Sequence, residues 1–147
     1  MDDPLRPPSG FADLVGYELV QWREDYAEIA LTVEARHLNR SGIMHGGLLA
    51  SLIDTACGYA GAYCPEPGRV RRAVTLALDT HFIGAVRPGS RLIATGRRTG
   101  GGRRTFFSTA EVRDQDGSLV GQGSCVHQYR KGSEDPRGVP EGGVPED

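Results

Sequence analysis

The sequence predicts an α+β domain in which an antiparallel sheet of about six strands curls around one long helix. Two observations carry this prediction. A single apolar stretch of helical length separates two strand patterns from four later ones. Tight turns join the later strands, which indicates antiparallel neighbours in one sheet. A sheet of this size twists, and it can therefore curl around a helix that covers one face.

The elements expected before the long helix are short. A short helix is predicted from Gly10 to about Gly16, and strands are predicted at residues 17–22 and 26–33. The second strand alternates cleanly, so that one face is apolar. Residues 35–45 are expected to form a loop that leads into the long helix.

The long helix is expected over residues 46–63, because Pro65 and Pro67 end the pattern. Its apolar side chains cover more than half of its circumference, as in a helix that is buried against a sheet. They are Leu48, Leu49, Leu52, Ile53, Ala56, Cys57 and Ala60.

Four strands follow the helix. Turn signals separate them at Pro88–Gly89, in the glycine run at 99–102 and in "DQDG" at 114–117. The strands are expected at residues 71–83, 90–98, 103–113 and 118–130. The folded domain is therefore predicted over residues 10–130, with a flexible segment at 1–9. Residues 131–147 are rich in Gly, Pro and acidic residues and lack apolar periodicity, which predicts a disordered tail.

Composition argues against several functional classes. The chain has 17 Lys and Arg against 19 Asp and Glu, and this balance gives no basic surface for nucleic acid. The apolar stretch at 42–63 contains His45, Asp54 and five glycines, which argues against a membrane span. Three cysteines without a disulfide pattern and an N-terminus unlike a signal peptide favour a cytoplasmic protein.

The stretch "NRSGIMHGGLLASLID", residues 39–54, gathers the polar groups that point to chemistry. Gly46 and Gly47 stand where the helix begins, and free N–H groups and a partial positive charge there favour an anion or a carbonyl oxygen. Asp54 lies among apolar neighbours, so it is expected to have hydrogen-bond donors or a raised pKa. Structural explanations also exist, because Asn39 and His45 are common turn and cap residues.

The longer segment "HLNRSGIMHGGLLASLIDTA" resembles the signature of hot-dog-fold acyl-CoA thioesterases, in the branch of the phenylacetate-pathway thioesterase. The resemblance covers about residues 10–130 and implies hydrolysis of aryl- or medium-chain acyl-CoA. It also implies the individual roles. Asp54 would attack the thioester or activate water, and the Gly46 N–H would polarise the carbonyl. Asn39, His45 and Thr75 would position the water or the thioester.

Coenzyme A brings phosphates, and the run "RRTGGGRRTFF" is the expected place to meet them. Guanidinium groups beside exposed glycine N–H groups suit a phosphate, although a solvated hairpin explains the same pattern. Phe82 is expected in the acyl pocket wall. The residues predicted to bind substrate or coenzyme A are Gly47, Phe82, Arg87, Gly102, Arg103 and Arg104.

No metal or cofactor is expected, because the four histidines are scattered and thioester hydrolysis needs only an oxygen nucleophile and an oxyanion donor. Two alternatives remain open. A hot-dog hydratase usually places a histidine five residues after the helix Asp, where this chain has Tyr59. A non-catalytic acyl-CoA sensor is the other, although the stretch before Tyr17 is too short for the helix-turn-helix expected of a transcriptional sensor.

The spacing of the motif predicts a dimer. Gly46 and Asp54 are separated by about 12 Å of helical rise, whereas reacting atoms must approach within roughly 3.5 Å. A second antiparallel helix solves this problem, and a two-fold axis then makes two sites. Each site would take Asn39, His45 and Gly46 from one chain and Asp54 and Thr75 from the other. The resemblance further implies that such dimers pair into homotetramers.

Overall fold

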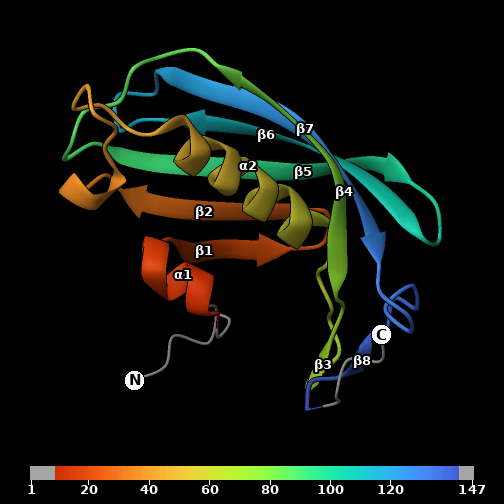
Figure 1. Ribbon diagram of the computed structural model, residues 1–147. Helices are drawn as coiled ribbons and strands as arrows, with labels where there is room; N and C mark the ends of the chain where they lie inside the picture. The colour runs from red at the N-terminus through yellow and green to blue at the C-terminus, as the bar shows by residue number, and fades with distance from the viewer. Residues whose placement is uncertain (1–8, 143–147) are drawn as a thin grey trace.

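A six-stranded antiparallel sheet curls around helix α2 (Gly46–Gly61) in the computed structural model, which describes residues 9–142 (Figure 1). The order of strands across the sheet is β1-β2-β5-β6-β7-β4. The predicted α+β hot-dog fold is therefore confirmed. The strands are β1 (Glu18–Arg23), β2 (Tyr26–Thr32), β4 (Ala73–Phe82), β5 (Arg91–Gly101), β6 (Thr105–Arg113) and β7 (Leu119–Tyr129).

Helix α2 begins and ends within two residues of its predicted bounds and forms the core with the concave face of the sheet. Leu52, Ile53 and Ala56 are completely buried. Gly96 in β5 permits this close packing, because a Cβ atom there would lie 2.2 Å from the carbonyl oxygen of Ala56. The helix is thus held directly against the sheet backbone.

The N-terminal part of the described chain closes one end of the core. Helix α1 (Gly10–Val15) is capped by the side chain of Ser9 and ends at Gly16, whose φ of 87° is left-handed. A short 3-10 helix, η1 (Ala35–His37), lies inside the segment expected to be a loop. Residues 1–8, expected to be flexible, lie outside the described residues, whereas Ser9 is part of the α1 cap.

Strand β5 differs from its prediction because it continues to Gly101, through residues expected to form a turn. The glycines stay in the ladder with β6, with an irregularity in register between Arg98 and Gly100. The turn itself is reduced to Gly102–Arg104, and the N–H of Gly102 donates to the carbonyl of Thr105 at 2.8 Å.

The predicted disordered tail is wrong for residues 131–142, which the structure describes as turns and strand β8 (Val139–Pro140). This strand pairs with β3 (Arg69–Val70), so that the C-terminal segment returns to the segment before β4. Arginine side chains replace the missing apolar contacts by donating to the carbonyls of the segment. They are Arg69, Arg71 and Arg72. Residues 143–147 lie outside the described residues.

Within residues 9–142, no helix combines the length and apolar character needed to cross a membrane.

Candidate active site

Asp54, Thr75 and His127 form a hydrogen-bonded cluster between α2 and the sheet. The hydroxyl of Thr75 donates to Asp54 Oδ1 at 2.7 Å. His127 Nε2 lies 3.4 Å from the same oxygen and 3.2 Å from Thr75 Oγ1. The second carboxylate oxygen, Oδ2, has no partner among residues 9–142, so it is available to a bound molecule.

The fold brings these residues together from three elements. Asp54 lies in the middle of α2, while Thr75 in β4 is the registered partner of His127 in β7. Gly58 leaves room for the histidine ring, because a Cβ atom there would lie 3.2 Å from His127 Nε2. The ring also stacks on Phe106, with a centroid distance of 5.1 Å and an interplanar angle of 6°.

His127 is the residue of this cluster that sequence reasoning missed. Its side chain is only 4% exposed, against 37% for Asp54. The signal was available, since strand alternation places residue 127 on the same face as Cys125 and Tyr129, which are also buried. A histidine on the apolar face of a strand must find a polar partner there, and in this protein the partners are Asp54 and Thr75.

Burial of Asp54 would by itself raise the pKa of its carboxyl group, but three contributions oppose that effect. Hydrogen bonds from His127 and Thr75, and the positive charge of a protonated His127, hold the pKa below its ordinary value of 3.8. Of the two alternatives expected for this carboxyl, the structure shows the hydrogen-bond donors, and the pKa is lowered instead of raised. Asp54 is therefore a carboxylate at neutral pH.

The residues at the N-terminus of α2 form a second set of predicted site residues. His45 is the N-cap, and its Nδ1 accepts the Gly47 N–H at 2.8 Å, so this N–H is not free to bind an anion as the sequence predicted for Gly47. The Gly46 N–H has no partner within the described chain. Phe82 covers Gly46, since a Cβ atom there would lie 3.1 Å from its ring.

Asn39 shapes the loop before the helix. Its Oδ1 accepts the N–H groups of Ser41 at 2.8 Å and Ile43 at 3.4 Å, which closes a turn and leaves the side-chain NH₂ without a partner in the described chain. No hydrogen bond of residues 9–142 joins Asn39, His45 or Gly46 to Asp54. One chain therefore holds the predicted residues in two separate groups.

A cavity of about 250 Å³ opens at the Asp54 cluster. The surface that lines the cavity is mostly apolar. Burial raises the pKa of Tyr59 to about 12, so the hydroxyl of this lining residue is uncharged at neutral pH. The lining residues are Asp54, Thr55, Gly58, Tyr59, Ala62, Arg71, Ala73, Thr75 and His127. Phe82, expected in the acyl pocket wall, does not line this cavity within a single chain.

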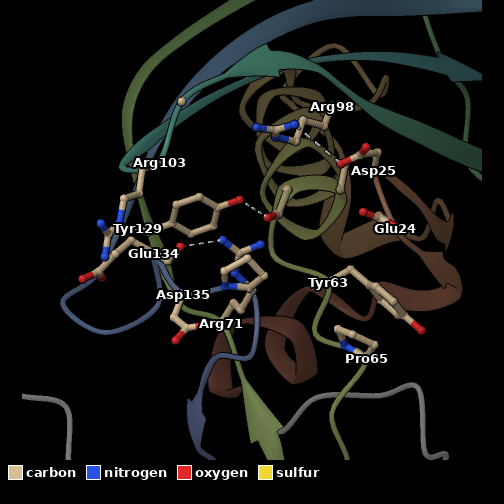
Figure 2. Close-up of a pocket in the computed structure, with 14 residues that line it drawn as sticks. Glu24, Asp25, Tyr63, Pro65, Arg71, Arg98, Arg103, Tyr129, Glu134 and Asp135 are labelled. Atoms are coloured by element: carbon tan, nitrogen blue, oxygen red, sulfur yellow. Dashed lines mark hydrogen bonds and ion pairs between the residues drawn. The ribbon is translucent and has the colours of Figure 1, made fainter.

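A larger cleft of about 630 Å³ adjoins the cavity and shares Arg71 with it (Figure 2). Gly102 and Arg103, predicted to meet coenzyme A, line this cleft, while Arg87 and Arg104 are exposed elsewhere on the surface. Acidic side chains line it too, and one of them, Asp25, lies 3.9 Å from Arg98. The cleft therefore carries charge of both signs.

In the part of the chain that the structure describes, no three His, Cys, Asp or Glu side chains gather into a metal site.

Known proteins share both the sequence and the fold. The model of the thioesterase superfamily matches residues 41–121. The acyl-coenzyme A thioesterase PaaI of Escherichia coli is 32% identical over 109 residues, 74% of each chain. The esterase candidate PA0474 of Pseudomonas aeruginosa is 32% identical over 84% of this chain and 92% of its own.

Among solved structures, the conserved protein PA5202 of Pseudomonas aeruginosa superposes with a TM-score of 0.72 at 33% identity. The match covers 83% of this chain and 94% of that one. The matched segment contains Asp54, Gly46 and Thr75, and the predicted family and its enzyme class, thioester hydrolase, are confirmed. The chain belongs to the thioesterase superfamily.

Proposed function

We propose that this protein hydrolyses acyl-CoA thioesters, releasing a free acid and coenzyme A, with Asp54 as the reacting carboxylate. The observation that carries the proposal is the ionised Asp54, which Thr75 and His127 hold through Oδ1 and which lines a cavity, while Oδ2 has no partner among residues 9–142. A relative named as an acyl-coenzyme A thioesterase supports the choice of substrate.

The proposed reaction begins when Asp54 Oδ2 attacks the thioester carbonyl carbon, or removes a proton from a water molecule that attacks it. As the C–O bond forms, the carbonyl electron pair moves to oxygen, and the Gly46 N–H stabilises the oxyanion. The C–S bond then breaks and coenzyme A leaves as a thiolate, which takes a proton from water in the first route and the proton held by Asp54 in the second. In the first route, water hydrolyses the resulting acyl-aspartyl anhydride and restores Asp54.

The lowered pKa of Asp54 favours the first route. A carboxylate with a pKa below 3.8 is a weak general base at neutral pH, whereas a nucleophile needs only to be ionised. A single turnover in ¹⁸O-labelled water distinguishes the two routes. Attack by Asp54 predicts a labelled Asp54 and an unlabelled free acid in those turnovers in which water opens the anhydride at the Asp54 carbonyl. General-base catalysis places the label in the free acid in every turnover, and that result without labelled Asp54 would favour the second route.

We also propose a homodimer with two shared sites, formed through β4. This strand is the edge of the sheet, and its apolar residues face solvent: Val74 is 45% exposed, Leu76 56% and Leu78 41%. An unpaired apolar edge is a template for another strand. Antiparallel pairing of two β4 strands about a two-fold axis would bring Asn39 and Gly46 of one copy towards Asp54 of the other. Association of dimers into a tetramer follows from the family resemblance alone.

A panel of aryl- and fatty acyl-CoA thioesters tests the activity, with a thiol-detecting reagent as readout. Wild type should release thiol from at least one member, and Asp54→Asn should abolish release while the melting temperature changes little. Absence of thiol release across the panel, with acyl-CoA binding retained, would replace the proposal with a binding module.

A further inference from the structure

We infer that the acyl cavity selects chains that end in a carboxylate, and that Arg71 binds this terminal group. The inference rests on the proposed function and specifies its substrate class: an acyl-CoA whose acyl chain carries an ω-carboxyl group. Arg71 lines the same cavity as Asp54, yet no step of thioester hydrolysis uses it.

Two rows of residues give the cavity its direction. Asp54, Gly58 and Ala62 follow one face of α2 at intervals of four, and span about 12 Å. Thr75, Ala73 and Arg71 lie at alternate positions of the β4 segment and its approach, and span a similar length. Because Thr75 is hydrogen bonded to Asp54, the rows are aligned with the carboxylate at one end and Arg71 near the other.

The residues that line the larger cleft also place Arg71 near the C-terminal end of α2. The cleft contains Arg71 together with Ala60, Gly61 and Tyr63 from the C-terminal end of α2, and it does not contain Asp54. We place the acyl chain of a thioester held at Asp54, and not its coenzyme A, along the helix towards Arg71. In this arrangement Gly102 and Arg103, which line the same cleft as Arg71, do not meet coenzyme A as the sequence predicted.

The guanidinium of Arg71 is held in place and still has hydrogen-bonding capacity. It stacks over the Tyr129 ring at 4.0 Å, and Nε donates to the Ser133 carbonyl at 2.9 Å. A longer contact of 3.5 Å joins Nη2 to the Glu134 carbonyl (Figure 2). Within residues 9–142, Nη1 has no partner and no carboxylate forms an ion pair with this guanidinium.

A fixed guanidinium of this kind suits a carboxylate, which accepts two parallel hydrogen bonds from it. The two rows span about 12 Å, and a contact distance of about 3 Å at one or both ends leaves about 6 to 9 Å between the thioester carbonyl carbon and the terminal carboxyl carbon. This distance is roughly five to seven bonds at the ~1.2 Å per bond of an extended chain. This length corresponds to a dicarboxylic acyl chain of roughly six to eight carbons.

A structural role for Arg71 is the competing explanation, because its donors also hold the C-terminal segment. Arg69 provides the matched control. It donates to the Arg137 carbonyl at 2.8 Å and to the Gly138 carbonyl at 2.6 Å, so it holds the same segment, but it does not line the cavity.

The experiment compares kcat/KM for suberoyl-CoA and octanoyl-CoA, which share a carbon number and differ in the terminal group. Wild type should prefer suberoyl-CoA. Arg71→Gln should lower kcat/KM for suberoyl-CoA by roughly tenfold to a hundredfold, the loss expected for hydrogen bonds to a charged group, and leave octanoyl-CoA within about twofold. Arg69→Gln should leave the ratio of the two substrates unchanged.

A ratio that Arg71→Gln does not change, or that Arg69→Gln changes equally, would overturn the inference. Wild type alone gives a second measurement that does not depend on a folded variant: 8-aminooctanoyl-CoA should be the poorest of three substrates, and turnover equal to that of suberoyl-CoA would overturn the inference as well. Failure to hydrolyse any thioester would overturn the proposed function with it, whereas turnover of octanoyl-CoA without a carboxylate preference would overturn only the role of Arg71.

Discussion

A single carboxylate shows how burial and hydrogen bonding compete in this protein. Asp54 loses part of its hydration inside the sheet, which raises its pKa, but Thr75 and His127 stabilise the charged form more strongly. The result is a carboxylate that is ionised, held through one oxygen and open at the other. These properties suit a nucleophile better than a general base.

Replacement of His127 should move the acid limb of the pH–rate profile. His127→Gln keeps a side chain that can donate to Asp54 but that cannot carry a positive charge, so the coulombic contribution that lowers the pKa of Asp54 is lost and the effect of burial remains. The pKa of Asp54 should therefore rise, and the acid limb of kcat/KM should move to higher pH. A pH profile of wild type and variant measures this shift, and Thr75→Ser, which keeps the hydroxyl, is the control. A limb that stays in place would show that His127 does not act on Asp54.

At the scale of single residues, the sequence predicts the residues of the motif better than the residues that contact them in the fold. Asp54 is found from the motif because a carboxylate within an apolar helix is unusual. His127 could be found only by combining strand alternation with the knowledge that β7 lies beside β4, a pairing that the motif does not contain. The hydrogen-bond partner of the Gly47 N–H was not predictable either, because it depends on the direction of the His45 side chain.

At the scale of elements, the contact between α2 and β5 depends on a glycine. Gly96→Ala should destabilise the fold by about 1 to 3 kcal/mol, because the new methyl group would meet the Ala56 carbonyl at 2.2 Å and the backbone would have to move. Chemical denaturation measures the loss. Gly100→Ala in the same strand, where nothing lies within 4 Å of the added Cβ, is the matched control. Equal stability of the two variants would contradict the close packing described for α2.

The C-terminal segment should contribute to stability although its composition resembles that of a disordered tail. Ser133 is buried, and its Oγ accepts the Arg72 N–H at 2.8 Å. Ser133→Ala leaves that N–H unpaired, so we expect a loss of about 1 to 3 kcal/mol in the free energy of unfolding. Exposed Ser118→Ala serves as the control. A Ser133→Ala variant as stable as wild type would restore the prediction of a dispensable tail.

The elements were predictable where a periodic apolar pattern exists, as in α2 and β2. The segment at 131–142 was not, because its order depends on guanidinium groups that donate to backbone carbonyls, and such contacts leave no periodicity in the sequence. The extension of β5 to Gly101 was missed for a related reason, since glycine usually marks a turn.

At the scale of the whole molecule, the proposed dimer would explain both the two separate groups of site residues and the apolar edge of β4. Within residues 9–142 of a single chain, Leu76 is exposed and the Gly46 N–H has no partner. A second copy packed on β4 would cover Leu76. It would also place the Gly46 N–H of one copy beside a substrate held at Asp54 of the other. Leu76→Glu should therefore yield monomers with little activity, and size-exclusion chromatography with light scattering measures the change. A Leu76→Glu dimer would exclude pairing through β4, and Phe11→Glu, at another exposed apolar residue, is the control.

Complementation between inactive chains tests whether each site is shared. Asp54→Asn and Asn39→Ala chains should each be nearly inactive alone, the first without its carboxylate and the second without the amide proposed to position the substrate. Refolded together in equal amounts, about half of the dimers should be mixed, and each mixed dimer has one intact site, with Asn39 from one copy and Asp54 from the other. Activity should return to roughly a quarter of that of refolded wild type by the same counting. If the mixture stays as inactive as its parents while wild type recovers in parallel, Asn39 and Asp54 act within one chain, and the exposed edge of β4 needs another explanation.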